Sequence, residues 1–309
     1  RMQKKQTTAE AEIEKEKLNV DMYALNSRVN DLYFGILLLD EQLKQNALLQ
    51  DELERNYRQI TAYVENGIAN QADLDAVKVE QLNTKQKRVE LASSRMAYLK
   101  MLSLLVGEKL SQETVLEKPV PQDDISAVGE IRRPELSLFN AQGVGLQVQE
   151  KALNVRHLPQ FGLFVQGAYG NPGLNMLKNE FSPYYIAGVR LSWNFGSLYT
   201  LKNDRKVIEN KRRQLDNNRD VFLFNTRLEM TQQDQAIQSL EKQMQDDDEI
   251  IRLRTNIRKS AEAKVANGTL TVTEMLRELT NESLARQSKA LHEIQRLMGI
   301  YQLKYTTND

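Results

Sequence analysis

Residues 158–196 read LPQFGLFVQGAYG, then a loop, then YYIAGVRLSWNFG, and they give the clearest strand signal in a chain whose pattern is otherwise helical. In the second half, apolar side chains alternate with polar or small ones. One face receives Tyr185, Ala187, Val189, Leu191, Trp193 and Phe195, and the other receives Gly188, Arg190, Ser192 and Asn194. This period of two predicts a β-hairpin with one apolar and one polar face.

The apolar face of this hairpin fits either a soluble core or the hydrocarbon of a membrane. No other segment gives a convincing strand pattern, and an isolated hairpin is marginally stable in water. Roughly 12 residues at about 3.3 Å each reach about 40 Å, enough to cross a bilayer when tilted. The loop over 171–183 is long, as outer loops of membrane barrels are. These features favour the membrane, with Tyr185, Trp193 and Phe195 near its interface and other strands or copies closing the barrel.

Composition excludes several classes of function. Basic and acidic residues number 42 each, which gives no electrostatic case for a nucleic-acid partner. There is no cysteine, so disulfides, thiolate metal sites and cysteine nucleophiles are excluded. No run of 18 apolar residues occurs, so the sequence predicts no membrane-spanning helix.

The remaining sequence predicts long amphipathic helices with few prolines or glycines. Their expected ranges are 8–63, 71–106, 133–156, 199–265 and 272–305, with an irregular connector over 108–132. The apolar positions expected to face other helices include Leu25, Val29, Leu32, Ile36, Leu39, Leu43 and Leu48, then Leu74, Val77, Leu82, Val89 and Leu99, and later Val272, Leu276, Leu279, Leu284 and Leu291. Helices of this length need helical partners, because they are not stable alone in water.

A break in the helical pattern occurs twice. Asn66-Gly67 and Asn267-Gly268 stand 201 residues apart, and each is flanked by long helical segments. This repetition indicates an internal duplication, and glycine is the usual residue just after a helix end. The second copy follows a hairpin and the first does not, so we expect another hairpin upstream of Arg1.

At these positions the chain resembles the TolC-like outer membrane efflux protein family. The resemblance covers the whole chain and depends on the order and spacing of motifs that are weak singly. They are Arg133-Pro134-Glu135-Leu136, Leu158-Pro159, the strand ending at Gly196, Asn66-Gly67-Ile68 with Asp73-Leu74, and Asn267-Gly268-Thr269 with Glu274-Met275-Leu276. With a single hairpin, the chain looks like an N-terminally truncated member.

The resemblance implies a mainly α fold of long antiparallel coiled-coil helices, one protomer of an α-barrel, with a β-hairpin contributing to a trimeric transmembrane β-barrel. The expected parts are a first helical hairpin (1–107, tip 64–72), an equatorial connector (108–132), a helix leading to the membrane (133–157), the β-hairpin (158–196) and a second helical hairpin (197–309, tip 265–272).

The resemblance also assigns roles to the tips. Asn66, Gly67, Ile68, Asn267, Gly268 and Thr269 would contact a periplasmic adaptor, which is joined to an inner-membrane pump. Asp73, Glu274 and Arg277 would lie at the periplasmic aperture. Arg277 takes a place that is acidic in the best-known member, so a Glu274–Arg277 pair would make the aperture less negative. Both carboxylates also suit the first turn of any helix, because the helix dipole favours them there.

No catalytic, cofactor-binding or metal-binding constellation is recognisable, so the sequence gives no indication of an enzyme. Asp246-Asp247-Asp248 is interpreted as a solvated helix face, and His157 and His292 lack neighbours at ligand spacing. The leading hypothesis is a passive exit duct for tripartite efflux or type I secretion in the outer membrane of a Gram-negative bacterium, with its helices in the periplasm. The alternative is a soluble coiled-coil scaffold or tether that oligomerises through its hairpin.

Overall fold

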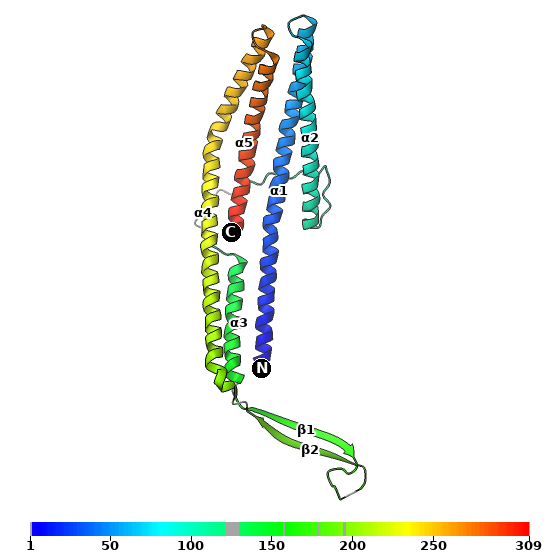
Figure 1. The fold of residues 1–309 in the computed structure, drawn as a ribbon, viewed down its shortest axis with the longest axis vertical. Coiled ribbons are helices and arrows are strands. Elements are labelled where there is room, and N and C mark those ends of the chain that lie inside the picture. The colour runs from blue at the N-terminus through cyan, green and yellow to red at the C-terminus, as the bar shows by residue number, and fades with distance from the viewer. Residues whose placement is uncertain (1, 121–129, 157, 178, 194–195, 309) are drawn as a thin grey trace. The chain divides into compact units, whose positions relative to one another are not determined.

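Five long helices and one β-hairpin make up the part of the chain that the structure describes. The computed structural model describes residues 2–120, 130–156, 158–177, 179–193 and 196–308. In chain order the elements are α1 (Met2–Glu65), α2 (Gln71–Val106), α3 (Pro134–Arg156), β1 (Gln160–Gly170), β2 (Ser182–Ser192), α4 (Gly196–Ala266) and α5 (Val272–Thr307) (Figure 1). The prediction of a mainly helical chain with one hairpin is therefore confirmed. None of the described helices has both the length and the apolar character needed to cross a membrane.

The chain divides into two compact units. The first comprises residues 1–20 and 134–222, and the second comprises residues 21–133 and 223–309. In the first unit, the Phe139 and Phe222 rings lie 5.9 Å apart, and Arg212 Nη2 donates to Glu150 Oε2 at 2.7 Å. These contacts pair α3 with the first part of α4.

The second unit contains both helical turns and the parts of the four helices next to them, and a hydrophobic core lies beneath the two turns. It is built from residues of all four helices: Leu53, Ile60, Val77, Ala261, Val265, Val272, Met275, Leu276 and Leu279. Because both hairpins contribute to one core, the two turns are held in a fixed relation within this unit.

Several apolar positions expected in the helix interfaces are exposed instead. Leu48, Leu82 and Leu284 are 50%, 51% and 54% exposed, whereas the polar Asn46 and Asn56 are buried. A straight helix drifts by about 20° per heptad relative to a 3.5-residue repeat. Over helices of 36 to 64 residues, a stripe read from spacings of three and four therefore turns away from its partner.

Ion pairs and hydrogen bonds of arginine and lysine side chains join the connector after α2 to the helices. Arg95 pairs with Asp40 of α1 and donates to the carbonyl oxygens of Gln112 and Thr114 at 2.8 and 2.7 Å. Lys118 Nζ lies 2.9 Å from Glu41 Oε1. Residues 121–129 lie outside the described part of the predicted connector.

The hairpin is shorter at its end than the sequence predicts. β1 and β2 pair antiparallel over 11 residues each, with Phe161 opposite Leu191 and Phe164 opposite Gly188. β2 ends at Ser192, so Trp193 follows the strand, and α4 begins at Gly196 rather than near residue 199. Asn194 and Phe195 lie outside the described residues, and their assignment to opposite faces stays a prediction.

Candidate functional site

The two helical turns have the same backbone geometry. Gly67 and Gly268 have φ values of 70° and 68°, a left-handed conformation that glycine adopts without steric cost. A Cβ at either position would meet nothing within 4 Å, so the backbone angle, and not crowding, favours glycine. Asn66 and Asn267 each donate a side-chain N–H to the carbonyl oxygen four residues earlier, at 2.7 and 2.9 Å.

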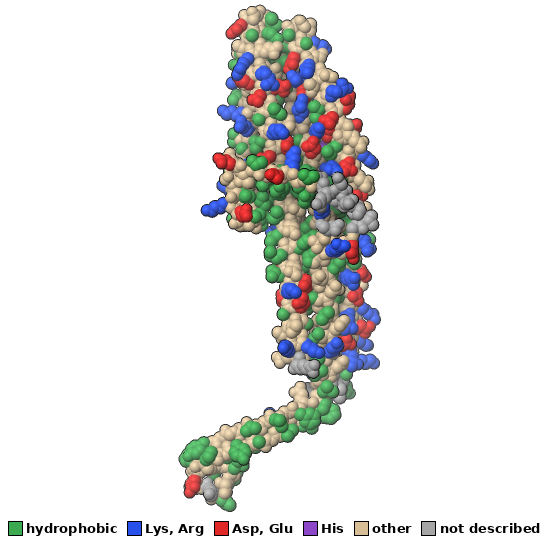
Figure 2. Space-filling model, turned by 180° about the vertical axis from the view of Figure 1, so that it is seen from behind, with side chains coloured by type: hydrophobic (Ala, Val, Ile, Leu, Met, Phe, Trp, Pro, Cys, Tyr) green, Lys and Arg blue, Asp and Glu red, His purple; other side chains and the backbone are tan. Residues whose placement is uncertain are grey.

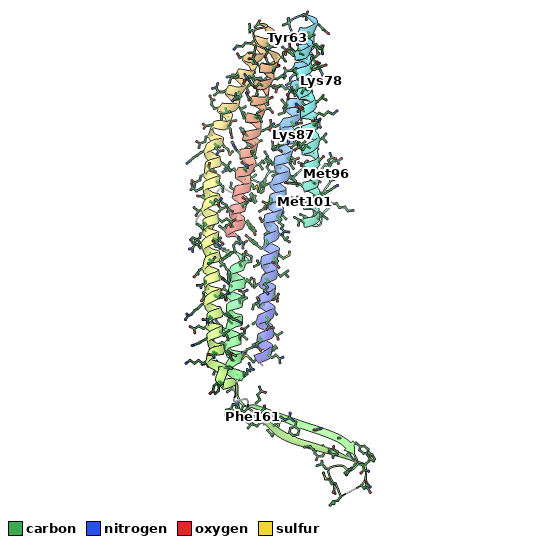
Figure 3. All side chains as sticks on the ribbon, in the orientation of Figure 1. Tyr63, Lys78, Lys87, Met96, Met101 and Phe161 are labelled. Atoms are coloured by element: carbon green, nitrogen blue, oxygen red, sulfur yellow. The ribbon has the colours of Figure 1, made fainter. Side chains whose placement is uncertain are left out.

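The residues after the two glycines also match. The N–H of Ile68 donates to Tyr63 O at 2.8 Å, and that of Thr269 donates to Lys264 O at 2.9 Å. Tyr63 is at the first turn (Figure 3). Ile68 is 50% exposed, so this turn offers an apolar side chain to solvent where the second turn offers a hydroxyl. The duplication read from the sequence is thus repeated in the hydrogen bonds, while the side chains at the tips differ.

Each turn leads into a helix through a capping box. Asn70 and Asp73 exchange two hydrogen bonds of 3.0 Å at the start of α2. At the start of α5, Thr271 Oγ1 accepts from the Glu274 N–H at 3.2 Å, and Glu274 Oε2 accepts from the N–H and the hydroxyl of Thr271 at 3.1 and 2.8 Å. Both acidic residues therefore satisfy N–H groups that the helix leaves open.

Glu274 is held as a carboxylate by these bonds. The hydrogen bonds from the Thr271 side chain and backbone lower the pKa of Glu274, and the charge of Arg277 adds a smaller effect in the same direction. Among the described ion pairs, Arg277 is joined to Glu278, whose Oε1 lies 3.7 Å from Arg277 Nε, and not to Glu274. The hydrogen bonds from Thr271 therefore keep Glu274 negatively charged.

A groove lies beside the second turn, between α4 and α5. Its volume is about 470 Å³. Its lining combines apolar side chains with charged ones at the edge: Asn256, Ile257, Ser260, Ala261, Lys264, Leu270, Glu274, Arg277 and Glu278. Ile257 is 46% exposed, so the groove offers apolar surface as well as charge to a partner.

A buried ionic cluster joins α1, α4 and α5, and the sequence alone does not reveal it. Arg258 of α4 lies 2.5 Å from Glu282 of α5, 2.5 Å from Glu262 of α4 and 3.3 Å from Glu52 of α1. The Glu282 side chain is 4% exposed, and it also accepts from Thr255 at 2.8 Å and from Arg286 at 2.6 Å. Nothing in the local sequence marks these residues, because the partners come from three helices.

The cluster is electrostatically satisfied. Burial raises the pKa of Glu282, but hydrogen bonds from Arg286, Thr255 and Arg258 outweigh it and leave the pKa below its usual value. Burial likewise lowers the pKa of Arg258, but the Glu282 hydrogen bond and the charges of Glu52 and Glu262 raise it overall. Both groups stay charged, so their ion pairs hold α1 against α4 and α5.

The interpretation of Asp246-Asp247-Asp248 as a solvated face is wrong for its central residue. Asp247 is 5% exposed, and its Oδ2 lies 2.9 Å from His292 Nδ1 on α5. Asp248, by contrast, is exposed and pairs with Lys289 at 2.5 Å. Consecutive helical residues point in different directions, so the middle one faces α5 while its neighbours face water. His157 lies outside the described residues.

The hairpin leaves its apolar face exposed. Hydrophobic side chains follow it along its length in Figure 2, and Phe161 marks its start in Figure 3. Leu163, Val165 and Tyr185 are 87%, 78% and 78% exposed. The remaining large exposed members of this face are Phe161, Tyr169, Val189 and Leu191, followed by Trp193 after the strand.

The geometry of long paired helices with one hairpin is also found in solved structures. The outer membrane protein VceC from Vibrio cholerae aligns with a TM-score of 0.79 and 11% identity, over 98% of this chain and 74% of that one. CusC aligns with a TM-score of 0.78 and 16% identity, over 99% and 74%. The CmeC outer membrane channel of Campylobacter jejuni aligns with a TM-score of 0.75 and 13% identity, over 98% of this chain and 66% of that one. The chain has the fold of an outer-membrane channel.

This channel fold agrees with the resemblance to TolC-like proteins that the turns and the hairpin indicate. No protein-family model and no curated protein matches the sequence. Residues 66–68 and 267–269 lie at the two turns, and Asp73 and Glu274 lie in the caps that follow them. The structure brings Glu274 and Arg277 to one groove, and it places Tyr185 on the apolar face of the hairpin.

Proposed function

We propose that this protein is the outer-membrane exit duct of a tripartite efflux or type I secretion assembly in a Gram-negative bacterium. Three copies would close a β-barrel in the outer membrane, with the helices extending into the periplasm. The exposed apolar face of the hairpin supports this most directly, because such a face is stable in hydrocarbon and costly in water. The channel fold of the chain supports it as well.

The proposed gate is at the helical turns. Asp73, Glu274 and Arg277 would line the periplasmic aperture, and residues 66–68 and 267–269 would contact the adaptor. The groove beside Gly268 offers the adaptor a surface with apolar and charged parts. Below it, the shared core and the Arg258 cluster hold the two helical hairpins together. An adaptor bound in the groove would favour an arrangement in which these contacts loosen, and the inner-membrane pump would supply the energy.

Planar-bilayer conductance of the full-length protein tests this function. Discrete, long-lived channel steps are expected after insertion. A protein that is folded and extracted from membranes, yet remains silent even when the Asp73 and Glu274 caps are removed by substitution to alanine, would contradict the channel. That result would favour the soluble scaffold.

A further inference from the structure

Phe164, Gly188 and Arg190 pack against one another on the polar face of the hairpin. Phe164 lies opposite Gly188 in the strand register. A Cβ on residue 188 would lie 2.9 Å from Cε1 and Cζ of the Phe164 ring. The ring therefore lies across the backbone of β2, in space that any residue larger than glycine would fill.

The ring in turn supports Arg190. The guanidinium carbon of Arg190 is 5.4 Å from the centroid of the Phe164 ring, within the range of a cation–π contact. Arg190 is the diagonal neighbour of Phe164 across the two strands, a spacing that long side chains bridge. The contact holds the guanidinium on the polar face, near the end of β2, and Arg190 stays exposed to solvent.

The charge of Arg190 is not balanced within the strands. Arg190 is the only charged residue in β1 and β2, both of which are fully described. Glu180, a carboxylate in the preceding loop, is ten residues earlier, or about 30 Å along an extended chain. The polar face of the hairpin therefore presents a fixed, uncompensated positive charge.

We propose that Arg190 selects anionic solutes in the membrane-spanning part of the pore. This inference rests on the proposed channel function, which directs the apolar face to lipid and the polar face to the water-filled lumen. Three protomers would then place three guanidinium groups around the lumen. A guanidinium binds carboxylate, sulfonate and phosphate groups through paired N–H donors. The solutes favoured are organic anions that carry one of these groups.

The first test is the reversal potential of the full-length protein in a KCl gradient. The Arg190→Gln variant is expected to lower the chloride-to-potassium permeability ratio by roughly twofold or more, while Arg190→Lys keeps most of it. An unchanged ratio in a conducting Arg190→Gln channel overturns the inference and leaves the channel intact. Absence of conductance that persists when the Asp73 and Glu274 caps are substituted by alanine overturns both, so the two failures are distinguishable.

The second test uses the absence of cysteine from the chain. Arg190→Cys and the matched Val189→Cys place a single thiol on the two faces of β2. A water-soluble anionic methanethiosulfonate is expected to react at position 190 and lower the conductance, and to leave position 189 unmodified in lipid. The reverse pattern, or equal reaction at both positions, overturns the assignment of Arg190 to the lumen.

Discussion

The carboxylate of Glu274 has two roles in the proposed channel. It caps α5, and it carries a negative charge at the proposed aperture. The cap needs an acceptor, and glutamine serves in a capping box as well as glutamate does. The charge needs an ionised group, which the bonds from Thr271 maintain by lowering the pKa of Glu274. The two roles are therefore separable by substitution, whereas a reversal of charge would damage both.

We predict that Glu274→Gln leaves the thermal unfolding midpoint close to that of the parent protein and raises the chloride-to-potassium permeability ratio, because it removes a negative charge from the proposed aperture. The matched control is Thr271→Ala, which removes the hydroxyl of the cap and keeps the charge. It is expected to lower the unfolding midpoint without changing selectivity. Reversal potentials and thermal unfolding of both variants provide the measurement. If Glu274→Gln leaves the reversal potential as it is, Glu274 does not lie at the aperture.

Helices α1, α4 and α5 are joined by a single guanidinium at their interface. The Arg258 side chain is 12% exposed and contacts one carboxylate on each of the three helices. Loss of one partner from a buried ion pair costs far more than replacement of both partners by apolar groups, because a lone buried charge loses its solvation without compensation. At the scale of elements, the cluster decides how firmly α1 is held to the α4–α5 pair.

We predict that Arg258→Met destabilises the protein by about 1–3 kcal/mol at neutral pH, because Glu282 loses one partner and keeps Thr255 and Arg286, and that the double variant Arg258→Met/Glu282→Leu recovers part of this loss. Because the pKa of folded Glu282 lies below its usual value, the stability from its charge is complete above the unfolded pKa and is lost as pH falls through the lowered one. Urea unfolding measured from neutral to acidic pH should show a larger loss of stability in the parent than in the double variant, which keeps other carboxylates of lowered pKa such as Glu274. Equal pH dependence in both would contradict the role of Glu282.

The turns and caps were predictable from the sequence, and the cluster was not, for physical reasons. A left-handed glycine and a capping box each depend on residues within four positions of one another. The pattern Asn-Gly followed by an acidic residue therefore indicates both the turn and the helix start after it. Arg258, Glu282 and Glu52 meet only because three helices pack at one level. The same reason applies to the burial of Asp247 against His292, which depends on the rotation of α4 toward α5.

At the scale of the whole molecule, α4 exposes an apolar surface of the kind that another helix usually covers. Ile250, Leu253 and Ile257 follow one another at spacings of three and four, and they are 45%, 47% and 46% exposed. Such a row on one helix face is stable when another helix covers it. In the proposed homotrimer, helices of the neighbouring protomer would cover Ile250 and Leu253, while Ile257 lines the groove proposed for the adaptor.

We predict that Leu253→Glu prevents trimer formation, because it places a charge in the middle of this apolar row, where burial against a neighbour would cost its solvation. Gln245→Glu is the matched control, since it adds the same charge at an exposed polar position of α4. Light scattering coupled to size-exclusion chromatography in detergent should give a trimer for the parent and the control and a monomer for Leu253→Glu. A Leu253→Glu protein that remains trimeric would place the subunit interface elsewhere. A parent protein that is monomeric would contradict the closed barrel itself, since one hairpin leaves open strand edges that hydrocarbon does not tolerate.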